Sequence, residues 1–254
     1  FTILKTTHLS TFPFLNYHKR MTILHAIILG LIEGLTEFLP VSSTAHLIIA
    51  SKLMNLESTD FLKAFEYIVQ GGAILSLVFL FTKDILTKPI LILKLIVAFL
   101  PTAIVGILLK KLLFDHLLDE TYLTLFMLGS IGIFMLFWDK FSFLNQNKYT
   151  NIETVPYKTL FLIGLIQSLA IVPGTSRAAA SIFAGLALGM DKPTAIKWSF
   201  LLALPTLFGA TAISFLDTDP QLLLTNLNLI IAGSLTAMIT GILFSKGVFL
   251  KCWS

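Results

Sequence analysis

The stretch that decides the fold is HAIILGLIEGLTEFLPVSSTAHLIIASKL, residues 25–53. It is apolar at both ends and broken in the middle by Pro40 and a run of polar residues. Each apolar half is shorter than the ~20 residues that a helix needs to cross a bilayer core. We therefore expect residues 21–55 to form a re-entrant helical hairpin, whose irregular tip must lie within protein or line a wet cavity.

The same pattern recurs at residues 157–190. Gly30-Leu31-Ile32-Glu33 is echoed by Gly164-Leu165-Ile166-Gln167, 134 residues later, and Pro40-Val41-Ser42-Ser43-Thr44 is echoed by Pro173-Gly174-Thr175-Ser176-Arg177, with one residue lost between. The echo predicts an internal repeat with a second re-entrant hairpin.

The rest of the chain reads as membrane-spanning. Hydrophobic residues make up 56% of it and charged residues 13%, against about 25% charged residues in soluble domains. Its single cysteine, Cys252, excludes a disulfide framework. Five runs have the length of a span, two of them only with flanking residues: 65–82, 89–109, 122–138, 198–216 and 227–245.

Loop charges orient these segments. Placing the basic loop 83–88 inside puts the acidic loop 217–226 outside and the basic tail inside, provided that the second hairpin returns to its own side. The first hairpin then enters from the outside. The expected fold is an all-α polytopic membrane protein with an inverted-topology repeat, in which broken helices meet near the bilayer midplane.

The domain prediction is a single membrane domain over residues 21–254, with repeat one at about 21–138 and repeat two at about 157–254. Residues 1–20 lack helical periodicity and precede Met21, so we expect a non-native or disordered extension; a signal peptide is the alternative.

The first hairpin carries two carboxylates in an apolar segment. Glu33 and Glu37 are four residues apart and share one helical face. An ionisable residue within a membrane is a functional hypothesis by default, and two close carboxylates need a divalent cation, another counter-charge or a proton. A pair that faces water at a helix end is the alternative.

Ser42, Ser43 and Thr44 follow Pro40, and His46 comes next among the polar residues. Ser43 and His46 are three apart, so a hydroxyl nucleophile with an imidazole base is possible, as is a phosphate ligand with an imidazole acid. Helix capping by the hydroxyls and simple packing of the histidine are the alternatives.

The second hairpin carries the groups of an anion site. Thr175, Ser176 and Arg177 stand where a new helix begins, so backbone N–H groups, the helix dipole and a guanidinium are available to phosphate oxygens. Arg177 alternatively serves as the structural partner of Glu33 or Glu37. Together the hairpins favour a metal-bound phosphate or diphosphate, and the membrane location favours a lipid tail on it.

The segments Glu33–His46 and Pro173–Arg177 closely resemble the two signature motifs of bacterial undecaprenyl-diphosphate phosphatases of the bacitracin-resistance type. The resemblance runs from about Met21 to about Leu250. It implies hydrolysis of undecaprenyl diphosphate to undecaprenyl phosphate and inorganic phosphate, which recycles the carrier lipid of cell-wall synthesis and confers bacitracin resistance. It also implies six spans with two hairpins, so the sixth span is expected to be missing after Ser254, and a site on the outer face of the inner membrane.

By position, the resemblance assigns catalytic roles to Glu33, Glu37, Ser43, His46 and Arg177. Ser43 either attacks phosphorus or orients a water that does, with His46 as base or acid. The expected phosphate ligands are Ser42, Thr44, Thr175, Ser176 and Ser181. Ser181 is included because this chain has Ala178 and Ala179 where the family usually continues Ser-Gly, and Ala45 likewise replaces a usual glycine.

The expected cofactor is a divalent cation, Mg²⁺ or Ca²⁺, held by Glu33 and Glu37. The expected partners are a polyprenyl diphosphate and the lipid bilayer; no nucleic acid is expected, and a homodimer is left open. Two alternatives remain: a transporter or lipid flippase of the same architecture, and an inactive truncated homologue.

Overall fold

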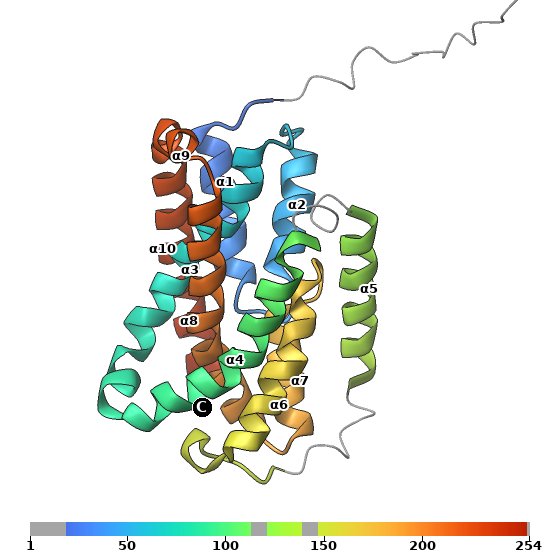
Figure 1. The fold of residues 1–254 in the computed structure, drawn as a ribbon, viewed down its shortest axis with the longest axis vertical. Helices are drawn as coiled ribbons and strands as arrows, with labels where there is room; N and C mark the ends of the chain where they lie inside the picture. Colours follow the sequence, from blue (N-terminus) through green and yellow to red (C-terminus); the bar gives the residue numbers. More distant parts are fainter. Residues whose placement is uncertain (1–18, 113–120, 139–146, 253–254) are drawn as a thin grey trace, which may run out of the picture.

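The computed structural model describes residues 19–112, 121–138 and 147–252 (Figure 1). These residues are almost entirely helical, and two isolated bridges, Lys19 with Leu56 and Tyr149 with Met190, are their only β pairing. The elements are α1 (Ile23–Thr36), α2 (Ser43–Leu53), α3 (Asp60–Thr87), α4 (Pro89–Leu112), α5 (Thr121–Phe137), η3 (Ile152–Thr154), α6 (Tyr157–Gln167), η4 (Ser168–Ile171), α7 (Arg177–Ala187), α8 (Lys192–Asp217), α9 (Pro220–Thr225) and α10 (Leu227–Cys252).

In the described part of the chain, four helices are long and apolar enough to cross a membrane: α3, α4, α8 and α10. They correspond to four of the five predicted spans. The fifth, predicted at 122–138, is α5, which has 17 residues and so stands at the lower limit of spanning length. The prediction of an all-α polytopic membrane protein is confirmed.

The two broken segments are helical hairpins. The chain turns between α1 and α2 and again between η4 and α7, and each pair of half-helices packs together. Figure 1 shows α1 and α2 at one end of the molecule and α6 and α7 at the other, with both turns directed toward its middle. The hairpins therefore enter the bundle from opposite ends, as the inverted-topology repeat predicts.

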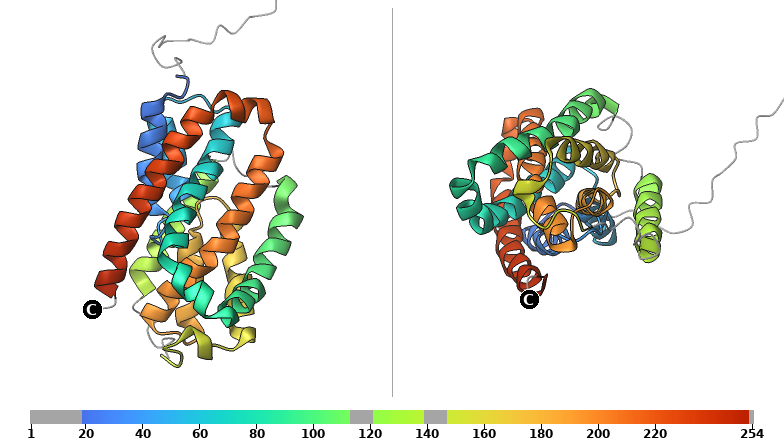
Figure 2. Two further views of the ribbon diagram at one scale, coloured as in Figure 1. Left: turned by 90° about the vertical axis from the view of Figure 1, so that its left-hand side faces the viewer. Right: turned by 90° about the horizontal axis from the view of Figure 1, so that it is seen from below.

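Glycines bring each hairpin onto a long helix of the other half. A Cβ at Gly34 of α1 would lie 2.6 Å from the carbonyl oxygen of Ala237 in α10, and a Cβ at Gly164 of α6 would overlap the carbonyl oxygen of Ala98 in α4. Figure 2 (left) shows α10 running beside α1. Such close backbone approach through small residues is how membrane helices associate, because lipid provides no hydrophobic driving force between them.

The segment before the second hairpin is fastened by a buried lysine. Lys94 of α4 donates from Nζ to the carbonyl oxygens of Ile152, Glu153 and Val155, at 3.0, 2.7 and 2.7 Å. At the surface, Lys88 lies 2.5 Å from Glu153, whose hydrogen bond and charge raise the pKa of the lysine. These contacts fix η3 and hence the position at which α6 begins.

The predicted extension, residues 1–20, lies outside the described residues except for Lys19 and Arg20. The repeat boundaries at 21–138 and 157–254 stay predictions.

Candidate active site

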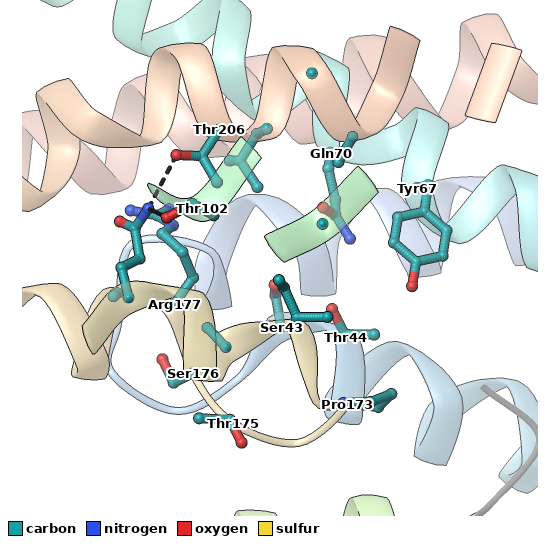
Figure 3. Close-up of a pocket in the computed structure, with 18 of the residues that line it drawn as sticks. Ser43, Thr44, Tyr67, Gln70, Thr102, Pro173, Thr175, Ser176, Arg177 and Thr206 are labelled. Atoms are coloured by element: carbon teal, nitrogen blue, oxygen red, sulfur yellow. Dashed lines mark hydrogen bonds between the residues drawn. The ribbon is translucent and has the colours of Figure 1, made fainter. Parts of the chain in front are cut away.

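A cavity of about 400 Å³ lies where the two hairpin tips meet α3, α4 and α8 (Figure 3). Polar side chains from the first hairpin and from the second line one part of it. These residues are Glu37, Ser42, Ser43, Thr44, Gln167, Thr175, Ser176 and Arg177. Tyr67 and Gln70 of α3, Thr102 of α4 and Thr206 of α8 complete the polar wall.

Most of the remaining residues that line the cavity form an apolar wall. It is formed by Phe99, Ala103, Gly106 and Ile107 of α4, by Leu207, Gly209, Ala210 and Ile213 of α8, and by Ala170 and Ile171 of η4. Ile107 is 67% exposed, so this wall continues to the outer surface of the bundle. A ligand with a polar head and an apolar chain matches such a cavity.

The tip of the first hairpin presents the start of α2. Ser42 caps this helix, with its hydroxyl accepting from the backbone N–H of Ala45 at 3.4 Å, and Ser43 is its first residue. Ser42 has φ 59° and ψ 91°, a left-handed conformation that is costly for a residue with a Cβ. Backbone strain of this kind concentrates at functional sites.

The tip of the second hairpin is built in the same way. Ser176 caps α7 by accepting from the N–H of Ala179 at 3.1 Å, and Arg177 is the first helical residue. Gly174 has φ 91°, and a Cβ there would lie 3.0 Å from that of Met127 in α5 and overlap the Thr124 carbonyl. Only glycine fits this turn.

The caps correct the predicted register of the repeat. Ser42 and Ser176 are 134 residues apart, the same separation as Gly30 and Gly164, so no residue is lost between the matching helix starts. The sequence echo placed Ser43 opposite Ser176 because it was anchored on the two prolines. The structure instead places Ser43 opposite Arg177.

Both of these first helical residues contact Glu37. Arg177 donates from Nη2 to Oε1 of Glu37 at 2.5 Å, and Ser43 donates from Oγ to Oε2 at 2.5 Å. The Arg177 and Glu37 side chains are only 10% and 5% exposed, so a charge-assisted hydrogen bond joins the hairpins in nearly dry surroundings. Of the two partners predicted for Arg177, the structure selects Glu37.

His46 takes a different position from the predicted one. Its Nδ1 lies 2.8 Å from the carbonyl oxygen of Ser42, and His46 is not among the residues that line the cavity. Since a carbonyl only accepts, Nδ1 carries the proton in this hydrogen bond. Ser43 donates its hydrogen bond to Glu37 and not to His46, because a carboxylate at the hairpin tip is a stronger acceptor than the imidazole one helical turn away.

Glu33 is fully buried and is not among the residues that line the cavity, and neither of its carboxyl oxygens has a hydrogen-bond partner among the described residues. It lies one turn before Glu37, whose N–H donates to its carbonyl at 2.9 Å. No group of three or more histidine, cysteine, aspartate or glutamate side chains capable of holding a metal occurs in the described parts of the chain. Glu33 has the unpaired oxygens that a cation needs, but a substrate would have to supply further ligands.

Ser181 does not line the cavity, in contrast to its predicted role. It is fully buried on the side of α7 that faces α8, where its hydroxyl lies 2.7 Å from that of Ser199 and 3.0 Å from the carbonyl oxygen of Arg177. Ala178 and Ala179 are also buried, and Ala179 still provides the N–H that Ser176 caps. The departures from the family motif therefore leave the helix start intact.

Sequence reasoning missed several residues of the site. Arg177 donates from Nη1 to the backbone carbonyl of Ser199 at 2.9 Å, which fixes the second edge of its guanidinium. Gln167 donates from Nε2 to the hydroxyls of Thr102 and Thr206, at 3.2 and 3.1 Å. A signal was present in the two Pro-Thr pairs, one within α4 and one within α8, since a helix broken by proline often faces a polar interior.

Comparison with known proteins shows the family of this chain. The model of the bacitracin resistance protein BacA family matches residues 26–252. The chain belongs to the BacA family. This match includes every residue that lines the cavity, the whole second hairpin and the first hairpin from Ala26 onward.

Among BacA relatives, proteins named undecaprenyl-diphosphatase are similar over most of their length. The one from Persephonella marina is 43% identical over 226 residues, covering 89% of this chain and 88% of the relative. The one from Campylobacter hominis is 42% identical over 240 residues, covering 91% and 90%. The one from Aquifex aeolicus is 35% identical over 230 residues, covering 89% and 88%.

Proposed function

We propose that this protein hydrolyses undecaprenyl diphosphate to undecaprenyl phosphate and inorganic phosphate, so that it recycles the cell-wall carrier lipid and confers resistance to bacitracin. The observation that carries the proposal is the contact of Ser43 and Arg177, each at a helix start, with the one carboxylate of Glu37. A possible nucleophile, its base and an anion-binding guanidinium thereby meet at one point of the cavity. The BacA relatives named undecaprenyl-diphosphatase support the same reaction.

The diphosphate is placed at the two hairpin tips. The starts of α2 and α7 each offer backbone N–H groups and the positive end of a helix dipole, and Arg177 adds a charged donor. Ser42, Thr44, Thr175 and Ser176 line the same region. The prenyl chain extends along the apolar wall between α4 and α8.

Glu37 is the base of the proposed reaction. Its Oε2 already accepts a hydrogen bond from Ser43 Oγ. In one route it takes the serine proton as Oγ attacks the terminal phosphorus; the bond to the bridging oxygen breaks, undecaprenyl phosphate leaves, and water then hydrolyses the phosphoserine. In the other route Ser43 orients a water that attacks directly, and Glu37 takes its proton.

Arg177 stabilises the transferring phosphoryl group. Its Nε has no partner in the described structure and Nη2 is held by Glu37, so the guanidinium can exchange the carboxylate for phosphate oxygens. Ser199 keeps the Nη1 edge in place during this exchange. His46 lies outside the cavity lining and acts, in this proposal, by holding the strained Ser42 backbone.

A divalent cation, Mg²⁺ or Ca²⁺, completes the proposed site. Glu33 and Glu37 would hold it together with diphosphate oxygens, because carboxylates and phosphates are the ligands these hard cations prefer. Bound there, the cation would neutralise charge on the phosphates. The unpaired oxygens of Glu33 fit this role.

The proposed location is the bacterial inner membrane, with the site open to the periplasmic side. The loop charges support this orientation, because they place the first hairpin on the outer side. A homodimer stays a prediction from the sequence.

The decisive experiment measures phosphate release from undecaprenyl diphosphate by the purified full chain in detergent, with added Mg²⁺ or Ca²⁺. Release by the wild type and its loss in Glu37→Gln and Arg177→Ala are expected, whereas Glu57→Gln, at an exposed position outside the cavity, serves as the matched control. Movement of labelled lipid across vesicle membranes without phosphate release would show that the protein is a flippase and not a phosphatase. A folded wild type that does neither would be an inactive homologue.

A further inference from the structure

Gln167 ends α6 at the rim of the cavity and is fully buried. It stands 134 residues after Glu33, so the repeat has a carboxylate in one hairpin and its neutral amide counterpart in the other. Buried amides normally satisfy all of their hydrogen-bonding groups. Gln167 satisfies only half of them.

The orientation of the amide is fixed by its two threonine neighbours. The Thr102 hydroxyl donates its proton to the carbonyl of Gly164 at 2.9 Å, and the Thr206 hydroxyl donates to the carbonyl of Leu202 at 2.7 Å. Toward Gln167 each hydroxyl therefore offers only a lone pair, which accepts from Nε2. Flipping the amide would bring oxygen against oxygen, so Nε2 stays on the threonines and Oε1 stays away from them.

Oε1 is left without a partner in the described structure. Two other buried polar atoms on the cavity wall share this condition, Arg177 Nε and Thr175 Oγ1. A guanidinium N–H donates, and a hydroxyl can do either, but an amide oxygen only accepts. A ligand that satisfied both atoms would bring a donor to Gln167 and acceptors to Arg177.

We propose that Gln167 makes the phosphate end of the cavity select a protonated oxyanion, with Oε1 accepting the hydrogen bond of a P–OH group. The proposal rests on the function proposed above and names a residue that determines its anion specificity. Inorganic phosphate keeps at least one proton throughout the neutral range, whereas sulfate carries none. A sulfate oxygen would face the lone pairs of Oε1, at a cost that phosphate avoids by rotating its hydroxyl into place.

The test compares inhibition of the full chain by inorganic phosphate and by sulfate. The readout is undecaprenyl phosphate formed from radiolabelled undecaprenyl diphosphate, so that added phosphate does not mask the product. For the wild type we expect phosphate to inhibit at a concentration about tenfold or more below that of sulfate, the ratio that corresponds to one hydrogen bond to a charged group.

Two substitutions separate selection by Oε1 from the structural bridge to the threonines. Gln167→Met keeps the length of the side chain without its polar atoms and should bring the phosphate-to-sulfate ratio close to one. Gln167→Glu keeps an acceptor but, like methionine, loses the Nε2 donor. It should retain the preference for phosphate, although both anions bind more weakly beside the added charge.

Thr206→Val removes one of the oxygens that Nε2 reaches and leaves Oε1 in place, so its ratio should stay that of the wild type. An unchanged phosphate-to-sulfate ratio in Gln167→Met would overturn the proposal. An equal change of this ratio in Gln167→Met and Gln167→Glu would overturn it as well. Either outcome would mean that Gln167 only bridges the threonines or binds water. A wild type that forms no undecaprenyl phosphate would instead remove the proposed function itself.

Discussion

Arg177 and Glu37 form an ion pair of 2.5 Å across the middle of the molecule, between side chains that are 10% and 5% exposed. The two residues are 140 positions apart in the chain and come from hairpins that enter from opposite ends. Breaking a buried pair leaves an uncompensated charge, which is far costlier than removing both partners together. The contact therefore couples the packing of the two repeats to the chemistry of the site.

The first prediction concerns the shape of the positively charged group of Arg177. Arg177→Lys keeps the positive charge, but a single ammonium cannot contact Glu37 and the Ser199 carbonyl as the two ends of the guanidinium do. We expect kcat/KM for phosphate release to fall about 100-fold, the usual loss for one donor to a transition state. Arg20→Lys, at an exposed position, is the matched control. A loss of less than about threefold would show that charge alone suffices.

The second prediction separates the two routes of hydrolysis. If Ser43 is the nucleophile, acid quenching of the wild type with substrate labelled at the terminal phosphate should leave label on Ser43, and Ser43→Ala should be unlabelled and inactive. If Ser43 orients a water, Ser43→Ala loses only part of the rate, since Glu37 remains available as the base. The control is Ser58→Ala, exposed and outside the cavity. Near-normal hydrolysis by Ser43→Ala would exclude the covalent route.

The third prediction concerns Glu33, whose buried carboxyl oxygens have no described partner. Glu33→Gln replaces a carboxyl group whose ionisation is penalised by burial without a hydrogen-bond partner, so we expect the thermal midpoint without divalent cations to rise. We expect the Mg²⁺ or Ca²⁺ concentration for half-maximal phosphate release to rise as well, by about tenfold or more, because one ligand is weakened. The thermal midpoint and the cation requirement are measured in the same buffer, so that the gain in stability can be compared with the loss of cation affinity. A normal cation requirement in Glu33→Gln would remove Glu33 from the cation site.

The sequence was sufficient for the hairpins, because proline and polar residues inside an apolar stretch leave few alternatives in a bilayer. It also singled out Glu37, Ser43 and Arg177, three residues whose side chains the structure brings into contact, since charged and hydroxyl groups are rarely placed within a membrane without a purpose. These predictions rest on local rules that need no knowledge of the neighbouring helices.

The partners of these residues were less predictable. Ser43 and His46 are close in sequence, but Ser43 bonds to Glu37 across the hairpin turn, and that turn depends on the unusual backbone of Ser42. The hydrogen bonds of Gln167 to Thr102 and Thr206 depend on how α4 and α8 pack against α6. The three residues come from distant segments, so the sequence alone did not indicate these contacts. Ser181 faces away from the cavity because the rotation of α7 about its axis is set by its packing against α8.

The fourth prediction tests the place of the prenyl chain. Gly106 lines the apolar wall of the cavity, and a Cβ there would meet no heavy atom within 4 Å. Gly106→Leu should therefore fill the cavity without disturbing the fold. We expect the KM for undecaprenyl diphosphate to rise by about tenfold, as expected when a buried apolar contact is displaced, and short-chain prenyl diphosphates to be affected less.

Gly129→Leu is the control for this substitution, because Gly129 has equally open surroundings but lies on α5, away from the cavity lining. Equal effects of the two substitutions, or an equal change for long and short prenyl chains, would place the lipid elsewhere.

The last prediction tests the contact between the halves of the repeat. A Cβ at Gly164 would overlap the Ala98 carbonyl, which belongs to the rigid backbone of α4 and cannot rotate away. Gly164→Ala should thus force α6 and α4 apart, at a cost of about 1–3 kcal/mol typical of overpacking. Gly132→Ala, where a Cβ meets nothing within 4 Å, should leave the thermal midpoint in detergent unchanged or slightly raised, because alanine favours helix.

The carbonyl of Gly164 also accepts the hydrogen bond of the Thr102 hydroxyl that orients Gln167, so Gly164→Ala should lose activity before it unfolds. A variant as stable and active as Gly132→Ala would show that α6 and α4 can separate without cost to the site.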